Sequence, residues 1–229
     1  MSAIDEINKM KDDFTEAKKG EPKTYVHMLL DDSVSMQSRR GAAIQMFNEQ
    51  VDAVRDMCAG QSIKVSLIKF SSHVSDPLYW DADVLKLEKI DEAVYNPDGA
   101  STRLMDGIGV SIAKLNALSD IADDNVSVLF MIVTDGEEND SREFDKAKIL
   151  DLIGAQEKTG RWTFTFLGAS KESLAEAASI GIHAGNTIMA ATAGDMMTVS
   201  CAAGANTRGY MADRKKGLRA TTDYYAGNR

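Results

Sequence analysis

The sequence predicts an α/β fold, with a doubly wound, mostly parallel central sheet, helices on both faces and one antiparallel edge strand. Short apolar runs alternate with segments of helical periodicity, the pattern of strands joined by crossover helices. Two runs, 25–30 and 126–133, are almost entirely apolar, as expected of strands buried on both faces. Each ends abruptly in acidic and hydroxyl residues. Sheets of this class bind ligands at that end of the strands.

The first half of the chain predicts a helix between two central strands. After the strand at 25–30, apolar residues recur at helical spacing over 39–58, and Gly60 ends this helix. Residues 62–72 are rich in β-branched and large apolar side chains and predict the next strand. Residues 77–87 predict a short strand, which we assign to the antiparallel edge.

The middle of the chain carries a second strand and helix pair. Asn96-Pro97-Asp98-Gly99 indicates a turn, and Thr102 opens a helix with apolar residues at helical spacing. Residues 126–133 form the most strand-like run in the sequence. Ser141 is expected to cap the helix that follows this strand.

The last third of the chain predicts two further strands and two helices. The expected order is a strand at 161–167, a helix at 171–180, a short strand at 182–189 and a helix at 190–210. A cluster of basic residues then predicts the exposed end of a helix followed by frayed chain. It comprises Arg208, Arg214, Lys215, Lys216 and Arg219.

The chain divides into a main domain and two flanking segments. Residues 1–22 predict an amphipathic helix packed on the domain, since apolar residues recur at helical spacing among Asp, Glu and Lys. Residues 23–189 hold the α/β domain, a usual size for one domain. Residues 190–229 predict a C-terminal helical extension and the basic tail.

Composition narrows the class of function. The net charge of −9 and hydrophobic content of 44% fit a globular protein that lacks the basic excess needed to neutralise phosphates. Cys58 and Cys201 form no Cys-x-x-Cys pair, so neither a disulfide framework nor a cysteine zinc site is indicated. We find no signal peptide and no apolar stretch long enough to span a membrane. We expect a cytoplasmic protein that binds neither nucleic acid nor membranes.

The polar residues after the strands predict a divalent-cation site. Asp31, Ser33 and Ser35 alternate, so an extended segment directs their oxygens to the same side. Thr102 and Asp135 follow other strands and are expected at the same edge of the sheet. Carboxylates, hydroxyls and waters suit Mg²⁺, whereas Ca²⁺ takes more oxygens and Zn²⁺ prefers His or Cys.

These residues also match a family. Asp31-x-Ser33-x-Ser35-Met36, Thr102-x-Leu104-x-Asp106-Gly107-Ile108 and Thr134-Asp135-Gly136 resemble the three segments of the metal-ion-dependent adhesion site (MIDAS) of von Willebrand factor type A (vWA) domains. The resemblance covers residues 23–189 and is nearest to stand-alone bacterial and bacteriophage cytoplasmic members. Many members have Gly before the site threonine; here Ser101 stands there, which makes Ser101 a competing ligand.

The resemblance implies a Rossmann-like fold and a function in binding rather than catalysis. It implies that a metal, Mg²⁺ with Mn²⁺ or Ca²⁺ as substitutes, is held by five residues and completed by a Glu or Asp of a partner protein. The implied metal residues are Asp31, Ser33, Ser35, Thr102 and Asp135.

Other roles for these polar residues stay open at this stage. Ser33 or Ser35 could cap the next helix, and Asp31 could accept backbone N–H groups. Asp32 and Asp106 suit supporting positions. An acidic rim of Glu137, Glu138 and Asp140 suggests a solvated loop.

Two alternative functions also stay open. One is a structural interaction module whose metal site is vestigial or purely stabilising. The other is a Mg²⁺-dependent phosphotransfer domain, suggested by the adjacent acids Asp31 and Asp32.

Overall fold

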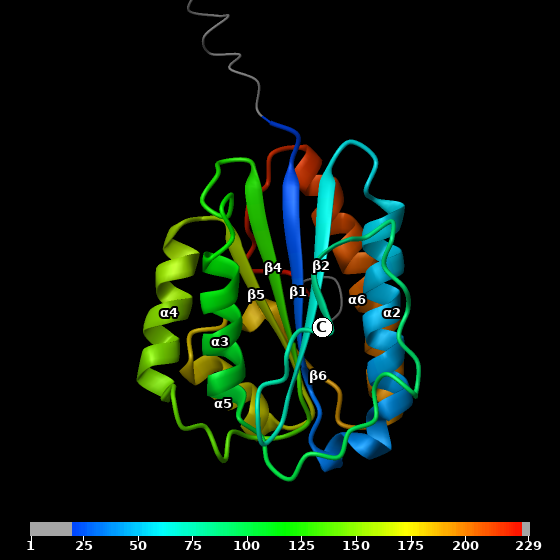
Figure 1. Ribbon diagram of the computed structural model, residues 1–229, viewed down its shortest axis with the longest axis vertical. Coiled ribbons are helices and arrows are strands. Elements are labelled where there is room, and N and C mark those ends of the chain that lie inside the picture. Colours follow the sequence, from blue (N-terminus) through cyan, green and yellow to red (C-terminus); the bar gives the residue numbers. More distant parts are fainter. Residues whose placement is uncertain (1–19, 226–229) are drawn as a thin grey trace, which may run out of the picture.

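The computed structural model describes residues 20–225, which form a six-stranded sheet between two layers of helices (Figure 1). The strand order is β3-β2-β1-β4-β5-β6, and β3 alone pairs antiparallel with its neighbour. The strands are β1 (Lys23–Asp31), β2 (Ser62–Phe70), β3 (Tyr79–Asp83), β4 (Val126–Val133), β5 (Trp162–Gly168) and β6 (Thr187–Met189). The predicted fold class, including the antiparallel edge strand, is confirmed.

Two types of helix, 3₁₀ and α, connect these strands. The 3₁₀ helices are η1 (Val34–Arg39) and η2 (Ala184–Asn186), and the α-helices are α2 (Arg40–Asp56), α3 (Leu104–Asn116), α4 (Lys146–Lys158), α5 (Lys171–Ser179) and α6 (Ala193–Lys215). None of the helices within residues 20–225 is long and apolar enough to cross a membrane. The predicted helix over residues 1–22 lies almost wholly outside the described residues.

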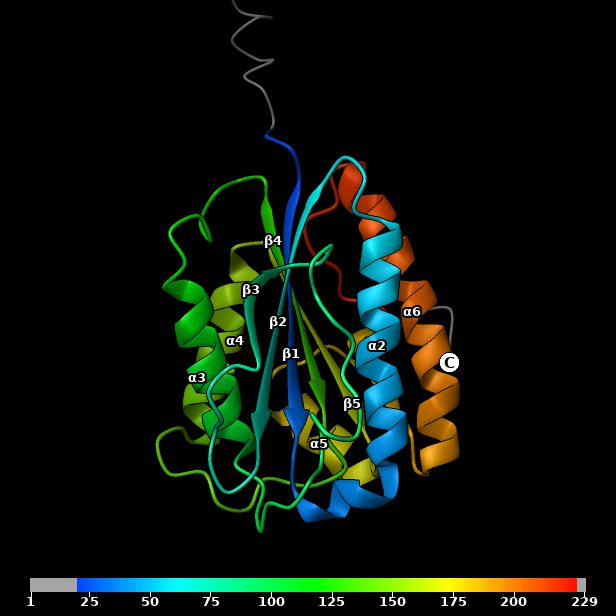
Figure 2. The same ribbon diagram turned by 45° about the vertical axis from the view of Figure 1, so that its right-hand side comes forward.

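Each face of the sheet has its own core because side chains alternate along the strands. In β1, Val26, Met28 and Leu30 pack toward α2 and α6, whereas Tyr25 and Leu29 pack toward α3, α4 and α5. Figure 2 shows α2 and α6 on one side of the sheet and α3 and α4 on the other. The sheet is therefore covered on both faces, which explains its almost uniformly apolar central strands.

The register aligns the strand ends that carry the polar loops. Leu30 pairs with Val133 of β4, and Asp31 pairs with Phe70 of β2. Asp31 and the residues after Val133 consequently lie at the same edge of the sheet, the carboxyl edge. The topology thus brings together loops that are about a hundred positions apart in sequence.

Two local predictions were wrong. The segment 96–99 makes no turn; Gly99 instead bridges to Ser33 in extended conformation, with Val34 N donating to the Gly99 carbonyl over 2.8 Å. A Cβ at Gly99 would lie 2.2 Å from the Ser71 Cβ, so this close approach requires glycine. Ser141 does not cap α4, which begins later with Asp145 as its N-cap. Local turn and cap propensities were overridden by contacts with distant loops.

The C-terminal segment packs against the sheet and α2. The helix predicted for 190–210 is present as α6, with Met196, Ala203 and Met211 in the core that it shares with α2. Between α6 and residue 225 the chain packs on the domain and is not a frayed end: Tyr224 and Tyr225 are buried. Tyr225 N donates to the Gly185 carbonyl over 2.9 Å, which holds this segment near β6.

Candidate metal site

Asp31 is the most buried member of the candidate site. Its side chain is 0% exposed, and its carboxylate accepts hydrogen bonds from the Ser33 amide (2.8 Å) and the Thr134 hydroxyl (2.5 Å). The Tyr95 hydroxyl donates to the Asp31 carbonyl. These contacts fix the orientation of the carboxylate at the end of β1.

The two serines link the β1 loop to the β4 loop. The hydroxyls of Ser33 and Ser35 lie 2.9 Å apart, and the Ser35 hydroxyl donates to Asp135 Oδ1 over 2.7 Å. Asp135 lies a hundred positions further along the chain than Ser35, yet the two side chains touch. The structure thus brings together Asp31, Ser33, Ser35 and Asp135, and neither serine hydroxyl caps the helix that follows.

Thr102 reaches the same edge from the loop before α3. Its side chain is buried, its amide donates to Asn139 Oδ1 (2.9 Å), and its carbonyl accepts from the Asn139 amide (3.1 Å). A Cβ built on Gly136 would lie 3.1 Å from Thr102 Oγ1 and 3.7 Å from Asp31 Oδ2. Thr102 and Asp31 therefore flank the side-chain space that Gly136 leaves empty.

Ser101, the competing ligand candidate, points elsewhere. Its hydroxyl donates to Asp140 Oδ2 over 3.1 Å, and Arg103 Nε donates to the same carboxylate over 2.9 Å. The Thr102 hydroxyl, rather than that of Ser101, is therefore the one that lies beside Gly136.

Burial and mutual repulsion shape the charge of the site. Burial raises the pKa of the Asp31 carboxyl, hydrogen bonds from Ser33 and Thr134 lower it, and the charge of Asp135 raises it further. The Arg39 guanidinium lies 3.4 Å from Asp135 Oδ2. Two carboxylates at the rim of an apolar core are stabilised when a cation lies beside them.

The acidic rim expected to be a solvated loop is partly structural. Glu138 accepts hydrogen bonds from the Met105 amide at the start of α3 (2.9 Å) and from the amide and hydroxyl of Ser141. An anion at a helix N-terminus satisfies free N–H groups and the helix dipole. The sequence hides this role because Glu138 and Met105 are 33 positions apart.

Two further acids occupy supporting positions, as the sequence suggested. Asp106 accepts hydrogen bonds from three consecutive amides of the β4–α4 loop, those of Arg142, Glu143 and Phe144. Asp32 pairs with Lys69 Nζ over 2.9 Å. Asp106 thereby anchors the loop that carries Asp135, and Asp32 fastens the β1 loop to β2.

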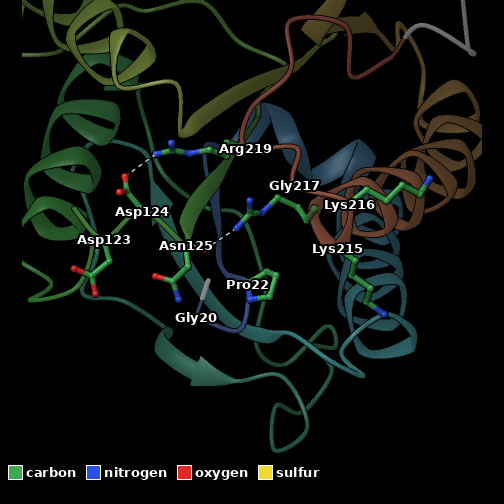
Figure 3. A pocket seen from close by; sticks show the side chains of 10 residues that line it. Gly20, Pro22, Asp123, Asp124, Asn125, Lys215, Lys216, Gly217 and Arg219 are labelled. Atoms are coloured by element: carbon green, nitrogen blue, oxygen red, sulfur yellow. Dashed lines mark hydrogen bonds and ion pairs between the residues drawn. The ribbon is translucent and has the colours of Figure 1, made fainter. Parts of the chain in front are cut away.

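A cavity lies at the opposite, amino edge of the sheet (Figure 3). It measures about 870 Å³ and is lined by basic and acidic side chains, including Asp124, Lys215 and Arg219. Arg214 borders it but is only 3% exposed, which corrects its assignment to an exposed helix end. Its guanidinium donates to the Thr24 hydroxyl and to the carbonyls of Lys23, Asn125 and Leu218.

The donor set at the carboxyl edge is oxygen-only. Within residues 20–225, no group of three or more His, Cys, Asp or Glu side chains could hold a metal ion. The site instead combines two carboxylates with three hydroxyls, a set that suits hard cations.

Sequence comparison identifies no relative: no protein-family model matches the chain, and no curated protein matches it. Solved structures do resemble it. The pilus adhesin SpaC from Lactobacillus rhamnosus GG matches 87% of the chain with a TM-score of 0.64 and 15% identity. Proximal thread matrix protein 1 from the mussel byssus matches 86% with a TM-score of 0.53 and 14% identity.

The chain spans only 31% of the adhesin and 46% of the mussel protein. A further structure of the mussel protein, with a zinc-occupied MIDAS motif, matches 79% of the chain at 13% identity and a TM-score of 0.52. Identities this low establish a likeness of fold only. The chain has a vWA-like α/β fold.

Proposed function

We propose that this chain is a divalent-metal-dependent protein–protein interaction module. In this proposal Mg²⁺, or Mn²⁺ or Ca²⁺ in its place, is held by Asp31, Ser33, Ser35, Thr102 and Asp135. The observation that carries the proposal is the hydrogen-bonded path from Ser33 through Ser35 to Asp135. This path brings side-chain oxygens from the segment after β1 and the segment after β4 into contact, although the two segments are far apart in the sequence.

The residues present fit such a cation. Two carboxylates balance a divalent charge, and hydroxyls with waters complete an oxygen shell. When bound, the metal supplies a Lewis-acidic position for one further oxygen ligand, which we propose is a Glu or Asp of a partner protein. The contacts of Asp31 with Ser33 and Thr134 orient its carboxylate before any cation arrives.

The surroundings of the site suit a protein partner. Ser35 is exposed, and Val34 beside it is 59% exposed. These apolar and hydroxyl groups at the exposed start of η1 give a partner both contact area and access to the carboxylates. The adhesin and the mussel matrix protein have the same fold, which supports a role in interaction.

We propose that the module is not an enzyme and that it works in the cytoplasm without binding nucleic acid or membranes. The charged side chain beside Asp135 is a guanidinium, which is neither a base nor a nucleophile at neutral pH. The net charge of −9 disfavours phosphate backbones.

The test is affinity capture from an extract of the source cell, with Mg²⁺ or with EDTA, using the wild-type chain and Asp31→Ala. We expect a partner that the wild type retains only with Mg²⁺ and that Asp31→Ala loses under both conditions. Calorimetric titration of the purified chain with MgCl₂ measures metal binding directly. Partner retention that is unchanged in excess EDTA contradicts the proposal.

A further inference from the structure

Arg39 is a cation fixed beside the candidate metal site. It is the last residue of η1, and its side chain is 17% exposed. Nη1 lies 3.4 Å from Asp135 Oδ2 and 3.3 Å from the Ser38 hydroxyl, whereas Nη2 donates to the Ala191 carbonyl over 2.5 Å. Its Nε is buried and has no hydrogen-bond partner.

The contacts of Arg39 with Asp135 and with Ala191 differ in length. Charge-assisted hydrogen bonds between a guanidinium and a carboxylate are typically about 2.7–2.9 Å long. The contact with Asp135, at 3.4 Å, is longer, and the contact with the Ala191 carbonyl is shorter. The guanidinium therefore lies closer to the segment between β6 and α6 than to the carboxylate of the site.

We propose that Arg39 is an internal counter-cation that competes with the divalent metal for Asp135 and couples metal binding to the β6–α6 segment. This inference rests on the proposed function, because it concerns regulation of the same site. With Arg39 in place, the charge of Asp31 and Asp135 together is partly neutralised, so the site attracts a second cation less strongly. The guanidinium thus lowers the metal affinity of the site.

The coupling follows from the position of Ala191. A divalent cation at Asp135 repels the guanidinium. Because the same planar group contacts Asp135 through Nη1 and the Ala191 carbonyl through Nη2, its displacement disturbs the bond to Ala191. By linkage, whatever stabilises that bond weakens metal binding by the same factor. Metal occupancy is thereby communicated to the start of α6, the long helix that covers α2.

The chain offers a matched control for the charge of Arg39. Arg40, the next residue, pairs with Glu92 over 2.6 Å and donates to Asn96. Arg40→Gln removes the same formal charge without removing any contact with Asp135 or Ala191. Arg39→Lys keeps the charge but loses the planar fork.

The experiment is calorimetric titration with MgCl₂ at constant ionic strength of the wild type, Arg39→Gln, Arg39→Lys and Arg40→Gln. We expect Arg39→Gln to bind Mg²⁺ about three- to tenfold more tightly, a change in the range of single ion pairs. Arg40→Gln is expected to change the affinity less than about twofold, because Arg40 pairs with Glu92 and not with Asp135. Arg39→Lys is expected to stay near the wild type. Equal affinities in all four proteins overturn the inference.

The other titration outcomes separate this inference from the proposed function. If Arg39→Gln binds Mg²⁺ and the other three proteins do not, the result supports both the metal site and the competition by Arg39. If none of the four proteins binds Mg²⁺, the proposed metal site fails and the competition fails with it.

A second measurement needs no variant. Hydrogen exchange of the wild type is followed over residues 187–196 with MgCl₂ and with EDTA. We expect faster exchange there when Mg²⁺ is bound. Bound Mg²⁺ with unchanged or slower exchange in this segment overturns the coupling.

Discussion

The two edges of the sheet both gather polar side chains, but they use them differently. At the amino edge, the Arg214 guanidinium donates to four acceptors on three segments of the chain, beside a cavity of about 870 Å³. At the carboxyl edge, two carboxylates and several hydroxyls meet with a single guanidinium, that of Arg39, beside Asp135. The candidate site is therefore identified by its cluster of carboxylates and hydroxyls, and not by the volume of a cavity.

If the amino edge is structural, removing its central cation has the largest effect on stability. Arg214→Ala removes four hydrogen bonds, those to the Thr24 hydroxyl and to the carbonyls of Lys23, Asn125 and Leu218. We expect a loss of about 4 kcal/mol in the free energy of unfolding, at about 1 kcal/mol or more for each hydrogen bond. Urea denaturation measures it. Arg208→Ala, on the same helix but exposed, is the control, and equal losses in both variants contradict this role.

The carboxyl edge is expected to respond to metal rather than to mutation alone. Mg²⁺ at a hundredfold excess over its Kd should stabilise the wild type by about 2.7 kcal/mol, because it binds the folded state only. Asp135→Asn keeps an acceptor for the Ser35 hydroxyl but removes a charge, and should abolish this gain. Thermal unfolding with MgCl₂ and with EDTA provides the measurement. A wild-type melting curve indifferent to Mg²⁺ counts against an occupied site.

Between the two edges, the middle of β1 holds a titratable side chain, His27, that belongs neither to the Arg214 hydrogen bonds nor to the candidate metal site. His27 is 0% exposed, both ring nitrogens lack hydrogen-bond partners, and burial lowers its pKa to about 3 from 6.5. Below pH 6.5 the unfolded chain binds a proton that the folded chain does not, so stability is lost as the pH falls toward 3.

We expect His27 to cost about 2 kcal/mol of stability between pH 7 and pH 5, since one pKa unit corresponds to about 1.36 kcal/mol. Urea denaturation at both pH values, in His27→Phe and in the exposed control His73→Gln, checks this. The pH dependence should shrink by that amount only in His27→Phe. A wild-type dependence retained in His27→Phe would show that other groups cause it.

The smallest effect tests the geometry of the carboxyl edge. Gly136→Ala places a methyl group 3.1 Å from Thr102 Oγ1 and near Asp31. We expect Mg²⁺ to bind about tenfold more weakly, or about 1.4 kcal/mol, with little change in stability. Gly154→Ala meets no atom within 4 Å and is the control for titration with MgCl₂. An unchanged affinity in Gly136→Ala would exclude Thr102 from the metal site.

The central sheet could be predicted from the sequence because its physical signal is local. The strand predicted for 126–133 matches β4 residue for residue, since a fully buried strand is apolar throughout and ends where it meets water. The alternation Asp31-x-Ser33-x-Ser35 pointed to residues that do lie close together, but its assumption of an extended segment was wrong, because Ser35 lies in the 3₁₀ helix η1. Hydrogen bonds then join these residues to Asp135.

The contacts that hold the loops in place could not be predicted in the same way. Arg214 resembled its exposed basic neighbours, and nothing local distinguishes it. Its backbone acceptors on Lys23 and Asn125 lie 191 and 89 positions away. Glu138 was likewise assigned to a solvated rim, because its partners at the start of α3 become adjacent only after the sheet has formed.

The packing of α6 and the segment after it has a consequence for biosynthesis. Residues 193–225 supply one wall of a core that also contains Val26, Met28 and Leu30 of the first strand. A ribosome therefore completes the whole sheet before this part of the covering can emerge, whereas α2, which covers the rest of the same face, emerges earlier. Nascent chains arrested near Met189 should be digested readily by protease, whereas chains extended past Tyr225 should resist it. Until then part of this apolar face stays exposed, and exposed apolar surface of this kind promotes aggregation.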